Sequence, residues 1–145
     1  NPKIANYQFT TVNPNLGVAN YDDKEITIAD IPGLVEGAHK GTGLGVQFLK
    51  HIERCKSLLH MIDITNIDIK KSYKQVKKEL KSYSPKLSKK KELVVLNKTD
   101  LINKNKINKI IKDFSKNIKS EVILLSTLEK KSISKIKAKL ISYGS

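Results

Sequence analysis

Short, almost wholly apolar runs recur along the chain and alternate with longer segments whose apolar residues recur at helical spacing. The runs predict β-strands at 16–21, 25–30, 57–63, 92–97 and 121–126. The last four runs are nearly continuous in apolar residues, which is typical of strands buried on both faces of a sheet. The amphipathic segments predict helices at 44–55, 70–83, 104–117 and 131–142.

This alternation of strands and helices predicts an α/β fold with a mostly parallel sheet. The segment YDDKE at 21–25 has the composition of a turn, so the first two strands are expected to form an antiparallel hairpin. In open parallel sheets, ligands bind beyond the carboxyl ends of the strands. We therefore expect a ligand site at that edge, where polar residues end or follow several strands, namely Asp30, Asp63, Asn97 to Asp100, and Ser126 with Thr127.

The 145 residues suffice for one ordinary domain with a hydrophobic core, and they carry a formal net charge of +14. This charge has two interpretations. It reflects either a compositional bias with solvated lysine-rich faces, or a surface that helps to bind RNA or a ribosome. Arg54 is the only arginine in the sequence, although arginine is the better reader of bases and phosphates, so both interpretations stay open.

Neither a membrane-spanning run nor a signal-peptide pattern occurs in the sequence. The single cysteine, Cys55, excludes an internal disulfide framework and suits a reducing compartment. The histidines His39, His51 and His60 have no metal-binding spacing among themselves. Together these observations predict a cytoplasmic protein.

The tetrapeptide NKTD at 97–100 directly follows a predicted strand. The carboxylate of Asp100 can accept two parallel hydrogen bonds from adjacent N–H groups on one edge of guanine, a donor pair that adenine lacks. An unpaired buried acceptor costs about 1–3 kcal/mol, so one carboxylate can discriminate between bases. Lys98 can lay its aliphatic stem over the base, and Asn97 can connect neighbouring loops. An aspartate before a helical segment is also typical of a helix N-cap, so the motif alone leaves both interpretations open.

Two further motifs have the chemistry of a magnesium–nucleotide site. In DIPG at 30–33, Asp30 offers a carboxylate for a magnesium-bound water, and Gly33 permits close approach of a phosphate. In FTTVN at 9–13, the hydroxyl of Thr11 is a hard oxygen ligand of the kind that Mg²⁺ accepts. Each motif also has a plainer interpretation, a Pro-Gly turn and a solvent loop. Their order along the chain, at strand ends or in loops that enter strands, favours the nucleotide site.

Three segments closely resemble the GTP-binding domain of the Obg family of bacterial GTPases: PKIANYQFTTVNPNLGV, IADIPGLVEGAHKGTGLGVQFLKHIERCKSLLHMID and NKTD. The resemblance is dense over about residues 2–66 and looser beyond. It implies a Ras-like G domain with helices on both faces of the sheet, of which residues 1–145 form the part from switch I to the last helix. The family's first strand lies mid-sheet, between those predicted at 25–30 and 57–63. Without it we expect a gap, closure of these two strands on each other, or another segment in its place.

The resemblance also implies a set of site residues. Thr11 matches the switch I threonine that binds Mg²⁺, and Asp30 matches the switch II aspartate that binds the ion through water. Leu34 stands where many small GTPases hold a catalytic glutamine, which implies slow hydrolysis and leaves no catalytic residue assigned. The implied GTP-binding residues are Phe9, Thr10, Thr11, Val12, Asn13, Asp30, Ile31, Pro32, Gly33, Asn97, Lys98, Thr99, Asp100, Ser126, Thr127 and Leu128.

From this resemblance we expect hydrolysis of GTP to GDP and phosphate, Mg²⁺ as the cofactor, and a ribosome or ribosomal RNA as the partner. The phosphate-loop motif G-x-x-x-x-G-K-[ST] does not occur in residues 1–145. We therefore expect impaired nucleotide binding by this truncated chain alone, unless a separate N-terminal piece completes the site in trans. The alternative is a truncated or degraded protein that binds no nucleotide and is at most a basic module associated with RNA or the ribosome.

Overall fold

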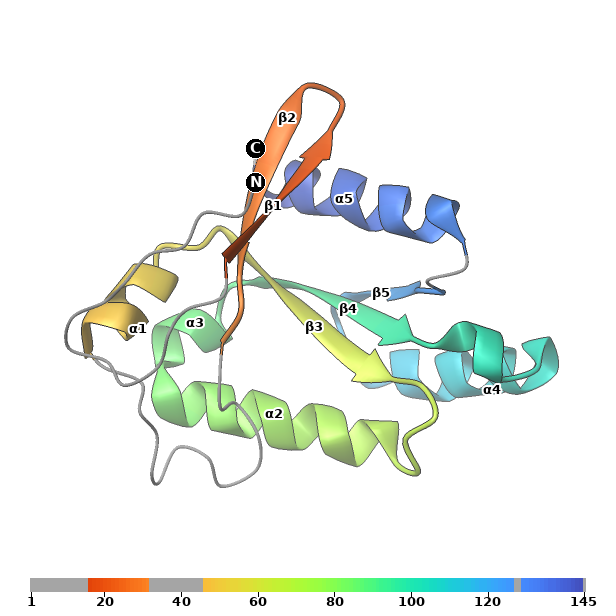
Figure 1. Ribbon diagram of the computed structural model, residues 1–145. Coiled ribbons are helices and arrows are strands. Elements are labelled where there is room, and N and C mark those ends of the chain that lie inside the picture. The colour runs from red at the N-terminus through yellow and green to blue at the C-terminus, as the bar shows by residue number, and fades with distance from the viewer. Residues whose placement is uncertain (1–15, 32–45, 127–128, 145) are drawn as a thin grey trace. The chain divides into compact units, whose positions relative to one another are not determined.

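The computed structural model describes residues 16–31, 46–126 and 129–144. Every strand and helix predicted from the sequence is present, with ends shifted by a few residues (Figure 1). Among the described helices, none combines the length and apolar character that a membrane crossing needs. In chain order the elements are β1 (Leu16–Tyr21), β2 (Lys24–Ala29), α1 (Val46–Ile52), β3 (Ser57–Asp63), α2 (Ile69–Tyr83), α3 (Pro85–Ser88), β4 (Lys91–Asn97), the 3₁₀ helix η2 (Thr99–Leu101), α4 (Lys104–Ser115), β5 (Glu121–Leu124) and α5 (Lys130–Gly144).

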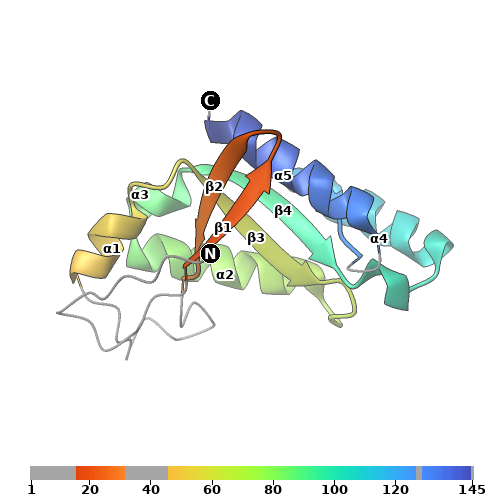
Figure 2. The same ribbon diagram turned by 45° about the horizontal axis from the view of Figure 1, so that its top comes forward.

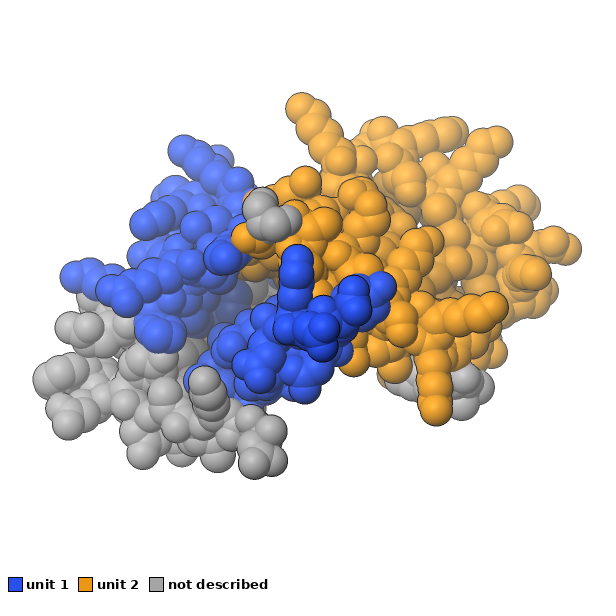
Figure 3. Space-filling model, turned by 90° about the horizontal axis from the view of Figure 1, so that it is seen from above, with its two compact units in different colours: residues 1–56, 74–90 blue, residues 57–73, 91–145 orange. Residues whose placement is uncertain are grey.

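The chain divides into two compact units (Figure 3). The first unit consists of residues 1–56 and 74–90 and includes the β1–β2 hairpin, α1, most of α2, and α3. The second unit consists of residues 57–73 and 91–145 and includes β3, the start of α2, and the elements from β4 to α5. All of the parallel strand pairing lies in the second unit, as far as the chain is described.

The predicted antiparallel hairpin is confirmed in the first unit. β1 pairs with β2 from Leu16↔Ala29 to Tyr21↔Lys24. The two turn residues, Asp22 and Asp23, both have positive φ, 48° and 64°, as the turn type that matches strand twist requires. The prediction that the second strand is buried on both faces is wrong, because five of the six residues of β2 are exposed. Within the described strands β2 pairs with β1 alone, so it belongs to a two-stranded ribbon.

Helix α3 was not predicted, since four residues are too few to show helical periodicity. Its start is nevertheless encoded locally. The hydroxyl of Ser84 accepts a hydrogen bond from the amide of Leu87 at 3.1 Å, and Pro85 occupies the first helical position. The same hydroxyl donates to Glu53 at 2.6 Å, which connects the cap to the residue that follows α1.

The second unit is built on a three-stranded parallel sheet in the order β3–β4–β5, which confirms the expected sheet type. The central strand β4 is the most buried, and Leu93, Val94, Val95 and Leu96 have no exposed surface. Helices α4 and α5 lie on opposite faces of this sheet (Figures 1 and 2). The continuous apolar run of β4 is therefore explained by burial on both faces.

The core on the α4 side has one large aromatic side chain at its centre. Phe114 is 1% exposed and packs in one cluster with apolar residues of β3, β4, the loop after β3, and α4. The edge of its ring meets the Tyr73 ring from the start of α2, with centroids 5.6 Å apart and an interplanar angle of 85°. The other buried members of this cluster are Ile62, Ile64, Val94, Leu96 and Ile107.

A polar cluster is buried beside this core. The carboxylate of Glu92 on β4 accepts hydrogen bonds from the Tyr73 hydroxyl at 2.6 Å and from the Ser120 hydroxyl at 3.0 Å. Its other oxygen lies 3.3 Å from Nδ1 of His60 on β3. Burial, followed by the hydrogen bond to Glu92, raises the pKa of Tyr73. His60 is thus a structural residue, and Glu92 is a buried acid with several partners.

The described strands form two separate sheets, β1–β2 and β3–β4–β5. The strands at 25–30 and 57–63 belong to different units, so the expected arrangements of this pair stay predictions. Each described strand is satisfied on at least one edge by a neighbour in its own sheet.

Candidate functional site

The NKTD segment, Asn97–Asp100, lies at the carboxyl end of the central strand of the parallel sheet. The strand register places Asp63 of β3 opposite Asn97 and Leu124 of β5 opposite Leu96. Both neighbouring strands therefore deliver residues to this segment. Lys98 has left-handed backbone torsion angles, φ 65° and ψ 34°, which turn the chain sharply out of β4 and into η2.

On the β5 side, the segment is held by main-chain and side-chain hydrogen bonds. The amide and the hydroxyl of Thr99 both donate to the carbonyl oxygen of Leu125, at 3.3 and 3.2 Å. The hydroxyl of Ser126 donates to Oδ1 of Asp100 at 3.2 Å. Ser126 is buried whereas Asp100 is exposed, so a fixed donor orients a carboxylate that faces solvent.

On the β3 side, the segment is held by an ion pair. The ammonium of Lys98 lies 2.8 Å from Oδ2 of Asp63. The amide of Ile64 donates to the main-chain oxygen of Asn97 at 3.0 Å, so the expected connection between neighbouring loops runs through the main chain of Asn97. The amide oxygen of the Asn97 side chain accepts from the amide of Lys98 at 2.8 Å and supports the sharp turn.

The N-cap interpretation of Asp100 does not match the structure. Helix α4 begins at Lys104, and its N-cap is Asn103, whose side chain accepts from the amide of Lys106 at 2.9 Å. Asp100 lies inside the short 3₁₀ helix that precedes it. Its carboxylate is therefore available for contacts other than a helix cap.

Of the remaining predicted site residues, Asp30 and Ile31 lie in the first unit, directly after β2, and Asp30 is exposed. The other predicted site residues lie outside the described residues, as does Leu34: they are 9–13, 32, 33, Thr127 and Leu128. The structure thus brings together Asn97, Lys98, Thr99, Asp100 and Ser126 from the predicted set. Within the described part of the chain, no three His, Cys, Asp or Glu residues are grouped in a way that could hold a metal ion.

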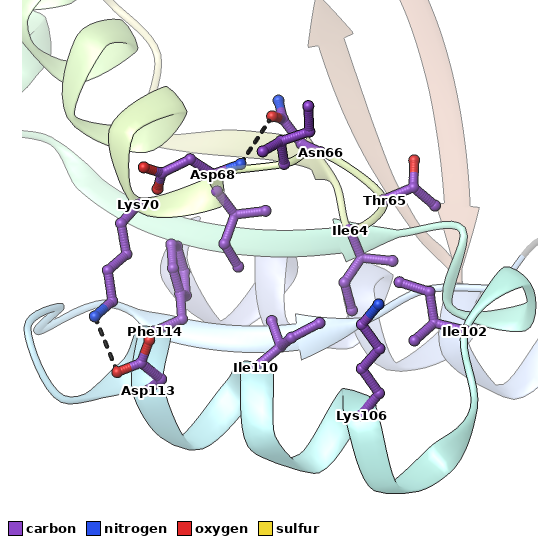
Figure 4. A pocket seen from close by; sticks show the side chains of 12 residues that line it. Ile64, Thr65, Asn66, Asp68, Lys70, Ile102, Lys106, Ile110, Asp113 and Phe114 are labelled. Atoms are coloured by element: carbon purple, nitrogen blue, oxygen red, sulfur yellow. Dashed lines mark hydrogen bonds and ion pairs between the residues drawn. The ribbon is translucent and has the colours of Figure 1, made fainter.

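A pocket of about 420 Å³ opens in the second unit between the loop after β3 and helix α4 (Figure 4). Its floor is apolar, with Ile64, Ile110 and Phe114, and an ion pair between Lys70 and Asp113 at 3.0 Å lies at one side. None of the predicted site residues lines it. The pocket is therefore separate from the Asn97–Asp100 segment.

The predicted set lacks Asp63, which contacts this segment, and Thr65, which contacts Asp63. Asp63 was noted only as a polar strand end, and Thr65 was not singled out. The carboxylate oxygen Oδ1 of Asp63 accepts from both the amide and the hydroxyl of Thr65, at 2.9 and 2.6 Å. The signal in the sequence was the D-x-T pattern at a strand end, which is typical of an Asx turn.

The pKa of Asp63 offers a direct test of the ion pair. Hydrogen bonding from Lys98, followed by hydrogen bonding from Thr65, lowers the pKa of Asp63 to about 2, from an ordinary value of 3.8. Because the folded-state pKa is depressed, the associated stability is present above about pH 4 and is lost as the pH falls toward 2. We expect Lys98→Met to raise the pKa of Asp63, and the exposed Lys104→Met to leave it unchanged. Titration of the carboxyl ¹³C signal measures both, and an unshifted pKa in Lys98→Met would contradict the ion pair.

The chain is similar to known GTPases. A family model described as "50S ribosome-binding GTPase" matches residues 1–98. GTPase Obg of Pelagibacter ubique is 70% identical over 144 residues, which cover 99% of this chain and 44% of that protein. GTPase Obg of Rickettsia felis is 50% identical over 135 residues, which cover 93% of this chain and 41% of that protein. The chain thus spans less than half the length of these curated relatives.

Solved structures show the same fold. The cytosolic domain of the Thermotoga maritima FeoB iron transporter in a GDP form superposes with a TM-score of 0.61 at 16% identity, over 99% of this chain and 53% of that one. Its apo form gives a TM-score of 0.59 at 17% identity, over 99% and 54%. The expected Ras-like α/β fold is confirmed. The chain therefore belongs to the family of 50S ribosome-binding GTPases and, within it, to the Obg-type GTPases.

Proposed function

We propose that this chain binds GTP and GDP and recognises the guanine base through Asn97–Asp100 and Ser126. The observation that carries the proposal is the double anchoring of one short segment at the carboxyl end of the central strand. Lys98 is held from β3 by Asp63 at 2.8 Å, and Asp100 is held from the β5 side by Ser126 at 3.2 Å. Ligands of open parallel sheets bind at this edge.

The chemistry of Asp100 matches the donor edge of guanine. An ionised carboxylate has about four acceptor sites on its two oxygens. One site on Oδ1 is used by Ser126, which leaves acceptors on both oxygens for the N1–H and 2-amino groups of the base. Thr127 and Leu128 follow Ser126 and would contribute main-chain contacts on the same side. The proposed base-binding set is thus Asn97, Lys98, Thr99, Asp100, Ser126, Thr127 and Leu128.

Binding of the phosphates and of magnesium is proposed for residues of the first unit. Thr11 would ligate Mg²⁺ directly and Asp30 would hold it through water, with the neighbours of each, 9–13 and 30–33, around the phosphates. Asp30 is exposed directly after β2, and Mg²⁺ commonly takes one or two protein oxygens together with phosphate oxygens and water. When bound, Mg²⁺ would neutralise charge on the phosphates.

The proposed parent reaction is hydrolysis of GTP to GDP and phosphate in the cytoplasm. Leu34 has no group that can orient an attacking water, so hydrolysis is expected to be slow without further help. A ribosome or ribosomal RNA is the proposed partner, in line with the +14 net charge and with the description of the matching family. A second candidate, a basic RNA-associated module that binds no nucleotide, rests on the same charge.

Titration with fluorescent GDP tests the nucleotide proposal. Residues 1–145 contain no G-x-x-x-x-G-K-[ST] sequence, so we expect weak binding by this polypeptide alone. A chimera in which the chain replaces the matching segment of P. ubique GTPase Obg is expected to bind GDP, with GTP but not ATP as a competitor. Failure of the folded chimera to bind GDP would refute the proposal. RNA binding that weakens steeply with salt, in the absence of GDP binding, would favour the basic module instead.

A further inference from the structure

The carboxylate of Asp63 is oriented by hydrogen bonds other than the one from Lys98. Its Oδ1 accepts two hydrogen bonds from Thr65, at 2.9 Å from the amide and 2.6 Å from the hydroxyl. Its Oδ2 is thereby aimed at the ammonium of Lys98, at 2.8 Å. Figure 4 shows the local basis of this arrangement, because Ile64 points toward α4 whereas the side chain of Thr65 points away from it. The loop after β3 is anchored in the core by Ile64 and presents an oriented carboxylate beside it.

Lys98 is held at both ends of its side chain. Its backbone is fixed in the left-handed region by the Asn97 side chain and by the sheet edge, and its ammonium is fixed by Asp63. The side chain of Lys98 keeps 53% of its surface exposed. A lysine stem that is held between two fixed points and is about half exposed offers an apolar strip on which a planar base can lie.

We propose that Asp63 is a positioning residue for nucleotide binding, which stretches Lys98 into a preformed platform for the face of a purine base. The inference rests on the proposed function and deepens it. Asp100 reads the edge of the base and so discriminates among bases. Asp63 acts through the stem of Lys98, which contacts the face of any purine, so it sets affinity without setting base preference. Ordering a long side chain before the ligand arrives removes part of the entropy loss of binding.

The variant Asp63→Asn in the chimera tests this role. It removes the ion pair and keeps an acceptor for Thr65. We expect the dissociation constants of GDP and of inosine diphosphate to rise by the same factor, about two- to fivefold, as for the loss of an exposed ion pair. Their ratio is expected to stay unchanged, and the melting temperature without nucleotide is expected to fall only slightly, as for the loss of an exposed ion pair. Because salt screens exposed charges, the difference from the parent chimera is expected to shrink as salt rises.

Four further variants separate positioning from a general change of charge. Asp68→Asn removes the same charge from the loop that follows Asp63, where Asp68 accepts from the amide of Lys71 at 3.1 Å and does not contact Lys98. It is expected to leave both dissociation constants unchanged. Lys98→Met and the double variant Asp63→Asn/Lys98→Met are expected to bind alike, since Asp63 acts only through Lys98. Thr65→Val, which removes one of the two bonds that aim the carboxylate, is expected to weaken binding in the same direction by a smaller factor.

The outcomes distinguish this inference from the proposed function. The parent chimera could bind GDP while Asp63→Asn has the same dissociation constant as the parent or as Asp68→Asn. That result would overturn the role of Asp63 and leave the proposed function intact. A changed ratio of the dissociation constants of GDP and inosine diphosphate would also overturn it, as would additive effects of the two substitutions in the double variant. A folded parent chimera that binds no guanine nucleotide would refute the proposed function, and the positioning role with it.

Discussion

The Asp100→Asn variant of the chimera is expected to lose about 10- to 100-fold in affinity for GDP and to gain affinity for xanthosine diphosphate. Guanine presents two donors to residue 100, N1–H and the 2-amino group. An asparagine supplies one acceptor and one donor, so its amide N–H₂ faces the 2-amino group of guanine and leaves both unpaired. Xanthine carries an oxygen in place of that amino group and pairs with the asparagine amide on both positions.

Competition titration with GDP and xanthosine diphosphate measures this exchange of preference. Asp113→Asn is the matched control, because Asp113 is an exposed carboxylate on α4 paired with Lys70 at 3.0 Å. Ser126→Ala removes the hydroxyl that orients Asp100, and it is expected to weaken GDP binding while keeping guanine preferred. Unchanged preference in Asp100→Asn would refute the assignment of Asp100 as the base-reading residue.

The Phe114→Ala variant is expected to lower the free energy of unfolding by about 3–5 kcal/mol. Phe114 is 1% exposed and touches the apolar cluster between α4 and the sheet, so alanine there leaves a cavity that rigid neighbours can fill only in part. It also removes the edge-to-face contact with Tyr73. The loss is comparable to a large share of the stability of an ordinary domain.

Denaturant unfolding of residues 1–145 measures the effect of Phe114→Ala. Phe114→Leu, which preserves most of the apolar volume, is expected to cost less than about 1.5 kcal/mol. Leu101→Ala is the exposed control, since Leu101 keeps 65% of its surface in solvent, and we expect a change within about 0.5 kcal/mol. Equal losses in Phe114→Ala and Leu101→Ala would mean that the α4 face of the sheet is not the core.

The sequence predicts a strand or helix best where the residues of that element alone determine its structure. The apolar run of β4 predicted a strand buried on both faces, and Leu93 to Leu96 are fully buried. The same reasoning was wrong for β2, whose apolar run gives the same prediction although most residues of the strand are exposed. The difference lies in strand partners. β4 has a neighbour on each side and β2 pairs with β1 alone among the described strands, and no local pattern encodes that.

The candidate site was predictable in its residue types and not in its contacts. NKTD indicated a guanine-reading segment, and Ser126 was placed beside it by the order of the strands. The ion pair between Lys98 and Asp63 joins residues 35 positions apart, and it follows from the register Asp63↔Asn97, which periodicity does not fix. Likewise, nothing in the apolar pattern around Glu92 indicates its hydrogen bonds to Tyr73 and Ser120.

The hydrogen bonds that join the Asn97–Asp100 segment to both neighbouring strands have a consequence for its motion. Ile64 donates to Asn97, Leu125 donates to Leu96, and Thr99 donates to Leu125, so the segment continues the hydrogen-bond ladders beyond the last strand pairs. Separating the segment from the sheet requires the ends of two hydrogen-bond ladders to open together, so the segment and the sheet form one cooperative unit. Unlike those of most surface loops, the amides of Ile64, Thr99 and Leu125 are then expected to exchange slowly, with those of the core strands, and an arriving ligand would meet a surface already in place.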